Sequence, residues 1–234
     1  MRETVFLAKK IIIFGKEFTV HLDTIGFTIF ACLFIFILCI WLKRKLQFIP
    51  TRKQLVLEVL LEWFDDVLRE SLGKRGRLFL GFIVTLFLFI LVSNWLGLIP
   101  GFLSPTRDLN VCLGLALLVL VVAHINAIKV KGLKQYLKSY FEPYWWLFAS
   151  NVFAEISKTL SHSFRLFGNI FAGGIAVAVI FQLCALLKAW GILPAVLIGF
   201  PIKAFLGFFM AGIQAFVFTI LAVSYISVLA QQYS

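Results

Sequence analysis

The sequence is short of charged residues, which make up 14% of the chain, whereas hydrophobic residues make up 62%. A typical soluble domain is about 45–50% apolar and about 25% charged. A soluble protein of 234 residues cannot bury so much apolar surface, because roughly a third of its surface stays in contact with water. These proportions exclude a water-soluble enzyme, a disordered chain and a collagen-like fibre. They indicate an integral membrane protein.

The chain has only four cysteines, and their pattern gives no indication of disulfides or of a metal site built on cysteine. The four cysteines lie inside apolar runs and lack the spacing of metal ligands, so we interpret them as small hydrophobic side chains. Internal repeats and low-complexity stretches are absent from the sequence. Residues 1–18 mix charges with apolar residues, and no small-residue cleavage site follows, so we expect no removable signal peptide.

Basic residues exceed acidic ones, with 22 Lys and Arg against 11 Asp and Glu and a formal net charge of +11. Such an excess can signal nucleic-acid binding. Membrane proteins also collect Lys and Arg on their cytoplasmic loops. We favour this second explanation and expect no nucleic-acid partner.

Five almost uncharged runs are long enough to cross a bilayer, which takes about 20 residues of helix. They are residues 25–42, 78–103, 109–128, 144–187 and 204–230. The stretch 51–72 is too charged to cross, and Glu58, Glu62, Asp65 and Arg69 share one stripe of it. This pattern predicts an amphipathic interfacial helix, whose acidic stripe either faces solvent or docks a basic partner. The sequence therefore predicts one all-α membrane domain with five membrane helices, the last two long and tilted.

Loop charges indicate the orientation. Nine basic residues lie in 43–77 and four in 129–138, whereas 104–108 holds only Arg107 against Asp108. Because the two basic loops lie on the same side, that side is expected to be cytoplasmic, with the N-terminus outside and the C-terminus inside. The N-terminal tail, with four bases and three acids, argues partly against this. A compact chain without a transit peptide favours a bacterial plasma membrane over an organelle.

The fourth predicted span carries a polar stripe. At about 100° per residue, six polar side chains fall within about 80° of one helix face. They are Asn151, Glu155, Lys158, His162, Arg165 and Asn169. A charge at the bilayer centre costs about 3 kcal/mol on insertion scales, so such residues usually face an aqueous path or a partner.

Arg165 is the charge of the stripe that is hardest to neutralise or to move to the membrane surface. An arginine cannot lose its proton, and this one lies about 30 Å along the helix. Several small residues follow it, including Gly168, Ala172 and Gly173. Small residues let another helix approach closely, so this surface suits a carboxylate carried by a partner helix. The alternative is an ion pair within the chain, with Glu155 or Asp108.

The last predicted span repeats the pattern more weakly. Lys203, Gln214 and Tyr225 are eleven residues apart and share one helix face. Gln214 lies near the middle of the span. It either extends a hydrophilic track from the fourth span or hydrogen-bonds between helices.

Two motifs resemble those of subunit a of the F-type ATP synthases. SHSFRLFGNIFAGG at 161–174 resembles the central motif of that family, and Arg165 falls on its essential arginine. GIQAFVFTILAVSYIS at 212–227 resembles the final helix of the family, and Gln214 falls on its characteristic glutamine.

The resemblance extends over nearly the whole chain, with two departures. SNWLGLIPG at 93–101 and the segment that begins SPTRDLN at 104 are similar to the second and third spans of the family. Asp108 and Asn110 fall on its polar pair at the mouth of the outer half-channel. Many members carry a carboxylate or histidine where this chain has Gly174 and Gly207.

The resemblance implies a non-catalytic stator subunit with two ion half-channels beside a ring of c subunits. Arg165 would face the ring carboxylate, with Gln214 and Asn169 near it, and Glu155 and His162 would serve the inner half-channel. His162 can equally be a hydrogen-bonding structural residue. The implied partners are the c-ring, the b-type peripheral stalk, the rest of the synthase and the lipid bilayer. No cofactor is expected beyond the translocated ion, H⁺ or Na⁺.

A secondary transporter or channel without a rotor is the main alternative, since intramembrane Glu, His and Arg also mark such pathways. Transporters of this kind often contain inverted repeats, and none is visible in this sequence.

Overall fold

The computed structural model describes residues 8–13, 16–44, 52–99, 102–141, 144–186, 197 and 199–231. The predicted end of the fourth span at residue 187 and the predicted start of the interfacial helix at residue 51 lie outside these ranges. The second predicted span, 78–103, includes residues 100 and 101, which also lie outside them. The strands are β1 (Ala8–Ile13) and β2 (Lys16–His21). The α-helices are α1 (Leu22–Arg44), α2 (Arg52–Leu72), α3 (Leu80–Leu96), α4 (Leu109–Lys131), α5 (Leu133–Ser139), α6 (Leu147–Leu186) and α8 (Phe200–Gln231), and the 3-10 helices are η1 (Gly73–Phe79) and η2 (Pro105–Arg107).

The described residues include five helical stretches that are long and apolar enough to cross a membrane. The second of them, Gln54–Leu96, runs through α2, η1 and α3. The prediction of an all-α membrane protein is therefore confirmed. A short antiparallel hairpin precedes α1, with Ala8 opposite His21 and Ile13 opposite Lys16. The hairpin was not expected from the sequence.

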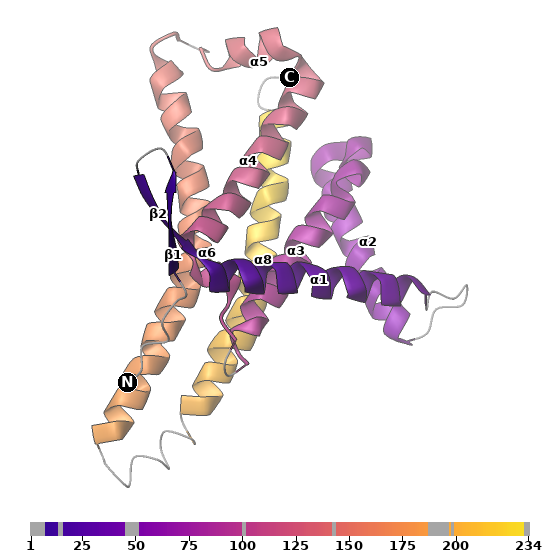
Figure 1. The fold of residues 1–234 in the computed structure, drawn as a ribbon. Coiled ribbons are helices and arrows are strands. Elements are labelled where there is room, and N and C mark those ends of the chain that lie inside the picture. Colours follow the sequence, from indigo (N-terminus) through magenta and orange to yellow (C-terminus); the bar gives the residue numbers. More distant parts are fainter. Residues whose placement is uncertain are drawn as a thin grey trace.

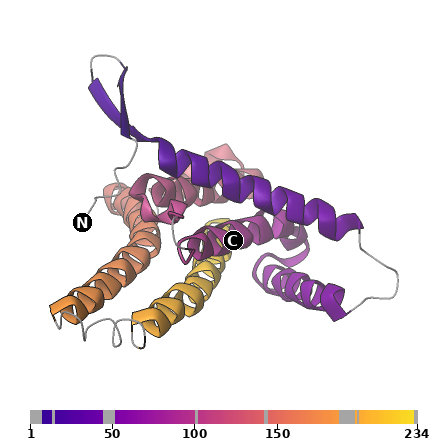
Figure 2. The ribbon, with the colours of Figure 1, turned by 60° about the horizontal axis from the view of Figure 1, so that its bottom comes forward.

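The long helices do not share one direction. In Figure 1, α6 and α8 run side by side, and α1 crosses them. Figure 2 shows α1 lying over α3 and α4, with α6 and α8 extending away beneath it. Helix α6 has 40 residues and is therefore about 60 Å long, twice the thickness of a bilayer core of about 30 Å. A helix of this length has to lie strongly tilted if it is to stay within the membrane.

Helix α8 forms the centre of the packing and contacts α3, α4 and α6. Its buried residues recur every three or four positions, as in Ala215, Phe218 and Ala222. Helix α4 faces it with a similar row that includes Ala123 and Ala127. Alanine at these positions lets the backbones approach closely, which is the usual way of packing helices in lipid.

Helix α2 is amphipathic, and its apolar side packs on α3. Phe64 and Leu68 are one turn apart and buried, and the ring of Phe64 lies 5.3 Å from that of Phe87. On the predicted acidic stripe, Asp65 forms an ion pair of 2.7 Å with Arg69. Gly76 in η1 lies so close to the Leu68 carbonyl that a Cβ atom would collide with it.

Candidate functional site

Helix α6 carries the predicted polar stripe along one continuous helix, and two cavities open on it at different heights. One cavity touches the stretch that includes Asn151, Glu155 and Lys158. The other touches the stretch from Asn169 to Ala178. Arg165 lies between these stretches and is exposed. The cavities are called below the inner cavity, at Glu155, and the outer cavity, at Asn169.

The inner cavity has a volume of about 100 Å³ and is lined by the end of α4, by α5, by α6 and by the end of α8. Glu155 accepts a hydrogen bond of 2.8 Å from the Lys158 ammonium. The amide of Asn151 donates a hydrogen bond of 2.9 Å to the carbonyl oxygen of Tyr140, which ties α6 to the segment that follows α5. Lys131 donates a hydrogen bond of 2.7 Å to the carbonyl oxygen of Leu229 on α8.

A hydrogen-bonded chain of side chains borders the inner cavity. The hydroxyls of Tyr136 and Tyr140 lie 2.8 Å apart, and the Tyr140 hydroxyl lies 3.2 Å from Nε2 of His124. Nδ1 of His124 is 2.8 Å from the carbonyl oxygen of Leu120, which can only accept a hydrogen bond. In neutral His124, Nδ1 therefore carries the proton, and Nε2 accepts one from Tyr140.

Burial raises the pKa of both Tyr136 and Tyr140 above its usual value of about 10. Both hydroxyls therefore stay protonated at neutral pH and remain available as donors. This cluster was not expected from the sequence. The feature of the sequence that could have indicated the cluster is a histidine inside an apolar span, followed by two tyrosines that are four residues apart.

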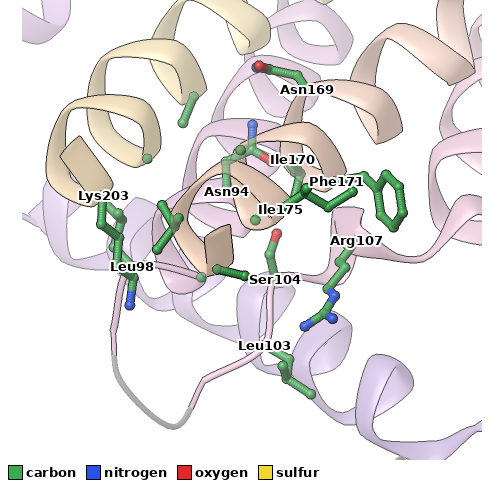
Figure 3. A pocket seen from close by; sticks show the side chains of 17 residues that line it. Asn94, Leu98, Leu103, Ser104, Arg107, Asn169, Ile170, Phe171, Ile175 and Lys203 are labelled. Atoms are coloured by element: carbon green, nitrogen blue, oxygen red, sulfur yellow. The ribbon is translucent and has the colours of Figure 1, made fainter. Parts of the chain in front are cut away.

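The outer cavity is larger, with a volume of about 470 Å³, and is bounded by α3, η2, α6, α8 and the segment between α3 and η2. Figure 3 shows the polar side chains of Asn94, Ser104 and Asn169 around it, and the basic side chains of Arg107 and Lys203. The described residues that line this cavity include no Asp or Glu. Its remaining walls are mostly apolar, with four glycines among them.

A buried hydrogen-bond network forms the polar side of the outer cavity. Thr106 Oγ1 donates to Asn94 Oδ1 over 2.6 Å and lies 2.7 Å from the Ser104 hydroxyl, which also contacts the Ser93 carbonyl oxygen at 2.8 Å. Asn94 is 6% exposed, and its Nδ2 has no hydrogen-bond partner among the described residues. In Figure 3 this nitrogen points towards the side of the cavity where Asn169 lies. The network thus leaves one buried donor unpaired on a residue that lines the cavity.

The two glycines that depart from the family pattern both line the outer cavity, and their surroundings differ. No side chain or distant backbone atom lies within 4 Å of the position that a Cβ atom would take at Gly174. At Gly207 the same position is occupied by the side chain of Leu98. The cavity therefore has room for a side chain at Gly174, whereas Leu98 fills the space at Gly207.

His162 and Gln214 lie between the two cavities and are buried, with 2% and 7% of their surface exposed. The imidazole of His162 packs on Phe218, with ring centroids 3.7 Å apart, and on Tyr225. Neither ring nitrogen of His162, nor Nε2 of Gln214, has a hydrogen-bond partner within the described ranges. The gap beside His162 has a volume of about 10 Å³, which is at the lower limit for one water molecule.

Of the other predicted residues, Asp108 and Asn110 lie apart from the walls of the outer cavity, whereas Asn169 lines it. Asp108 caps α4 by accepting a hydrogen bond of 2.9 Å from the Asn110 backbone N–H. Neither of these two is among the described residues that line the outer cavity. Asn169 lines that cavity and donates a hydrogen bond of 3.5 Å to the carbonyl oxygen of Met210.

The small residues after Arg165 leave space on α6. Ala172 is exposed. No side chain or distant backbone atom lies within 4 Å of the position that a Cβ atom would take at Gly168 or at Gly173. Gly173 also lines the outer cavity. Within the described ranges no three His, Cys, Asp or Glu residues are grouped in a way that could hold a metal ion.

A family model described as ATP synthase A chain matches residues 25–227. A protein named ATP synthase subunit a from Moorella thermoacetica is 41% identical over 184 residues, which cover 79% of each chain. A protein of the same name from Geobacter sulfurreducens is 35% identical, covering 87% of this chain and 86% of its own. Another, from Acidothermus cellulolyticus, is 34% identical and covers 88% and 76%.

Proposed function

This chain belongs to the ATP synthase A chain family, and from that premise we propose that it forms the ion path of an F-type ATP synthase. The inner and outer cavities are two half-channels for H⁺ or Na⁺, and no cofactor takes part. Arg165 is the stator charge that faces a carboxylate on the ring of c subunits. The chain is not catalytic by itself, and it couples ion flow to rotation of the ring.

One observation carries this proposal: two separate cavities, each with polar groups in its walls, open on the same helix, with an exposed arginine between them. On α6, the lining residues nearest to Arg165 are Lys158 of the inner cavity and Asn169 of the outer one, seven residues before it and four residues after it, so the cavities begin roughly 10 Å and 6 Å from it along the helix. A continuous channel would not be interrupted by a fixed positive charge between two cavities. Two half-channels that are separated in this way require a carrier that takes the ion from one to the other.

The mechanism follows from the charges. An ion enters one half-channel and neutralises a ring carboxylate, which can then move through lipid at a much lower cost. When the carboxylate returns, the guanidinium of Arg165 favours its charged form and releases the ion into the other half-channel. The same fixed charge repels cations and blocks a direct leak between the cavities. The membrane potential supplies about 2.3 kcal/mol per charge for each 100 mV.

The two half-channels use different chemistry. In the inner one, the carboxylate of Glu155 borders the cavity and is held by Lys158, while His162 packs deeper in the helix bundle. In the outer one, amide and hydroxyl groups of the Asn94 network replace the carboxylates or histidines that the family pattern has at Gly174 and Gly207. Asn169 and Gln214 lie on the path between the outer cavity and Arg165.

The orientation is N-terminus outside and C-terminus cytoplasmic, in the plasma membrane of a bacterium. An exposed aromatic group at residues 144–146 supports this, because Tyr and Trp concentrate at membrane interfaces. It follows closely on the four lysines of 129–138, which favour the cytoplasmic side. The c-ring packs against the open face of α6 at Gly168 and Ala172, and b-type stalk subunits hold the chain in place.

The test uses Arg165→Ala in the purified complex, reconstituted into vesicles. We expect ATP synthesis driven by an ion gradient to fall to background while the complex stays assembled, with increased passive leak of the coupling ion. Comparing H⁺ with Na⁺ gradients identifies that ion. The control is Arg77→Ala, which removes an exposed arginine from η1. Unchanged synthesis in Arg165→Ala would favour a transporter without a rotor, or an arginine with a purely structural role.

A further inference from the structure

The corner between α4 and α5 carries a basic surface that the proposed ion path does not use. Residues 129–141 contain four lysines and no Asp or Glu. Lys129, Lys134 and Lys138 are exposed. Lys131 reaches inwards and is anchored by its hydrogen bond to the Leu229 carbonyl oxygen. Such a cluster directly after a membrane helix is the usual pattern for attracting anionic lipid headgroups.

Helix α5 has three distinct sides. Tyr136 is buried against the protein, and Ser139 next to it is buried as well. Leu133 and Leu137 are one turn apart, and they are 59% and 53% exposed. Lys134 and Lys138, also one turn apart, lie directly beside these leucines. In Figure 1, α5 runs across the end of α4 and does not continue its direction. Exposed leucines next to exposed lysines suit a helix at the lipid interface, where apolar side chains meet acyl chains and lysines meet headgroups.

A hollow opens at this corner. It has a volume of about 690 Å³ and is lined by the α4–α5 junction and one side of α5, including Lys131, Lys134 and Lys138. Gly132 makes the sharp turn between the helices with a φ of +80°, a conformation that other residues rarely adopt. The hollow shares Lys131 and Ser139 with the inner cavity, so the two spaces have a common wall.

We propose that this hollow binds the headgroup of an anionic phospholipid, with the phosphate at Lys134 and Lys138 and the acyl chains along Leu133 and Leu137. The exposed leucines distinguish a lipid from free phosphate, which would gain nothing from them. Trp145 and Trp146, which follow α5 closely in the chain and are exposed, favour a lipid over an acidic protein segment, because Trp concentrates at membrane interfaces.

The site has a consequence for ion transport, and this part rests on the proposed function. A lipid phosphate at Lys134 and Lys138 puts a negative charge beside the wall that the hollow shares with the inner cavity. That charge raises the local concentration of cations at the cytoplasmic mouth of the half-channel. Ion transfer through the inner cavity should therefore depend on the lipid composition of the membrane.

The binding test uses native mass spectrometry of the whole purified complex after addition of phosphatidylglycerol or phosphatidylcholine. The variants are Lys134→Gln with Lys138→Gln, the charge-preserving Lys134→Arg with Lys138→Arg, and a matched control, Lys74→Gln with Arg75→Gln, on exposed bases of η1. We expect the parent, the arginine variant and the control to retain more phosphatidylglycerol than phosphatidylcholine. The α5 glutamine variant should lose about one phosphatidylglycerol per complex.

Three results would overturn the site. They are unchanged phosphatidylglycerol retention in the α5 glutamine variant, an equal loss in the η1 control, and displacement of the lipid by inorganic phosphate. The transport consequence is measured separately, as ATP-driven ion uptake into vesicles with and without phosphatidylglycerol. Uptake should respond to the lipid in the parent and not in the α5 glutamine variant. An equal response in both refutes the consequence and leaves the site standing, whereas a parent that transports no ion refutes the proposed function alone.

Discussion

Gly174 and Gly207 both border the outer cavity, yet a side chain would meet different surroundings at each. Alanine is favoured over glycine in a helix interior by about 1 kcal/mol, and this gain applies equally to both positions. At Gly174 no steric clash opposes this gain in helix stability, because the Cβ position is open. At Gly207 the new methyl group collides with Leu98, and overpacking of this kind typically costs about 1–3 kcal/mol.

We therefore expect Gly174→Ala to leave the thermal stability of the complex unchanged or slightly raised, and Gly207→Ala to lower it. The difference should amount to about 1–3 kcal/mol in the free energy of unfolding. Adding Leu98→Ala to Gly207→Ala makes room for the methyl group and should recover part of the loss in a double-mutant cycle. Equal stability of the two single variants would mean that Leu98 moves aside without cost.

At the scale of single residues, the sequence predicts the α6 stripe well, because helical spacing alone puts Glu155 and Arg165 on related faces of one helix. It predicts the outer cavity less well. Asn94 comes from α3, and Ser104 and Thr106 from the segment around η2, so their hydrogen bonds depend on how two separate elements pack. Helical periodicity carries no information about such contacts. The roles of these residues in ion transport stay predictions.

At the scale of elements, α5 is a helix that the sequence does not predict. Its residues were interpreted as part of a basic loop, because seven residues of helix are too few to produce a visible period. The helix is held by tertiary contacts instead, through the Tyr140 hydroxyl to His124 and through the Tyr140 carbonyl to Asn151. Short helices that depend on packing are those that local sequence patterns miss most easily.

These contacts predict a dependence of stability on pH. Burial raises the pKa of Tyr136 and Tyr140 in the folded protein, so their contribution to stability is fully present below the ordinary tyrosine pKa of about 10. It is lost as pH rises through the folded-state values, because the unfolded chain then binds fewer protons than the folded one. We expect the melting temperature of the complex to fall more steeply above about pH 10 in the parent than in Tyr140→Phe.

The measurement is differential scanning fluorimetry of the parent and Tyr140→Phe across this alkaline range. Tyr144→Phe is a matched control, because that tyrosine is exposed and outside the cluster. Titration of lysines contributes equally to all three proteins, so only the difference between the curves is interpreted. Identical slopes for the parent and Tyr140→Phe would show that the Tyr140 hydroxyl contributes nothing to the stability of this corner.

At the scale of the whole molecule, the number of membrane helices follows from apolar length, and the tilt of α6 follows from its 40 residues. The positions of the two cavities do not follow from either. They depend on how α6 and α8 pack with α4 and α5 at one height and with α3 and η2 at the other. Charge counts in loops predict which side of the membrane is cytoplasmic. Only this orientation decides which cavity is the inner one and which is the outer one.

That orientation can be tested with single cysteines in a chain whose four native cysteines are replaced by alanine. Lys74→Cys and Lys134→Cys sit on exposed basic segments, and Phe102→Cys is exposed between α3 and η2. Because Lys and Arg concentrate on cytoplasmic loops, a membrane-impermeant thiol reagent should label the first two only in inverted bacterial membrane vesicles. It should label Phe102→Cys only in intact cells. The reverse pattern would put the Glu155 cavity on the outside and the Asn94 cavity on the cytoplasmic side, which exchanges the roles of the two half-channels.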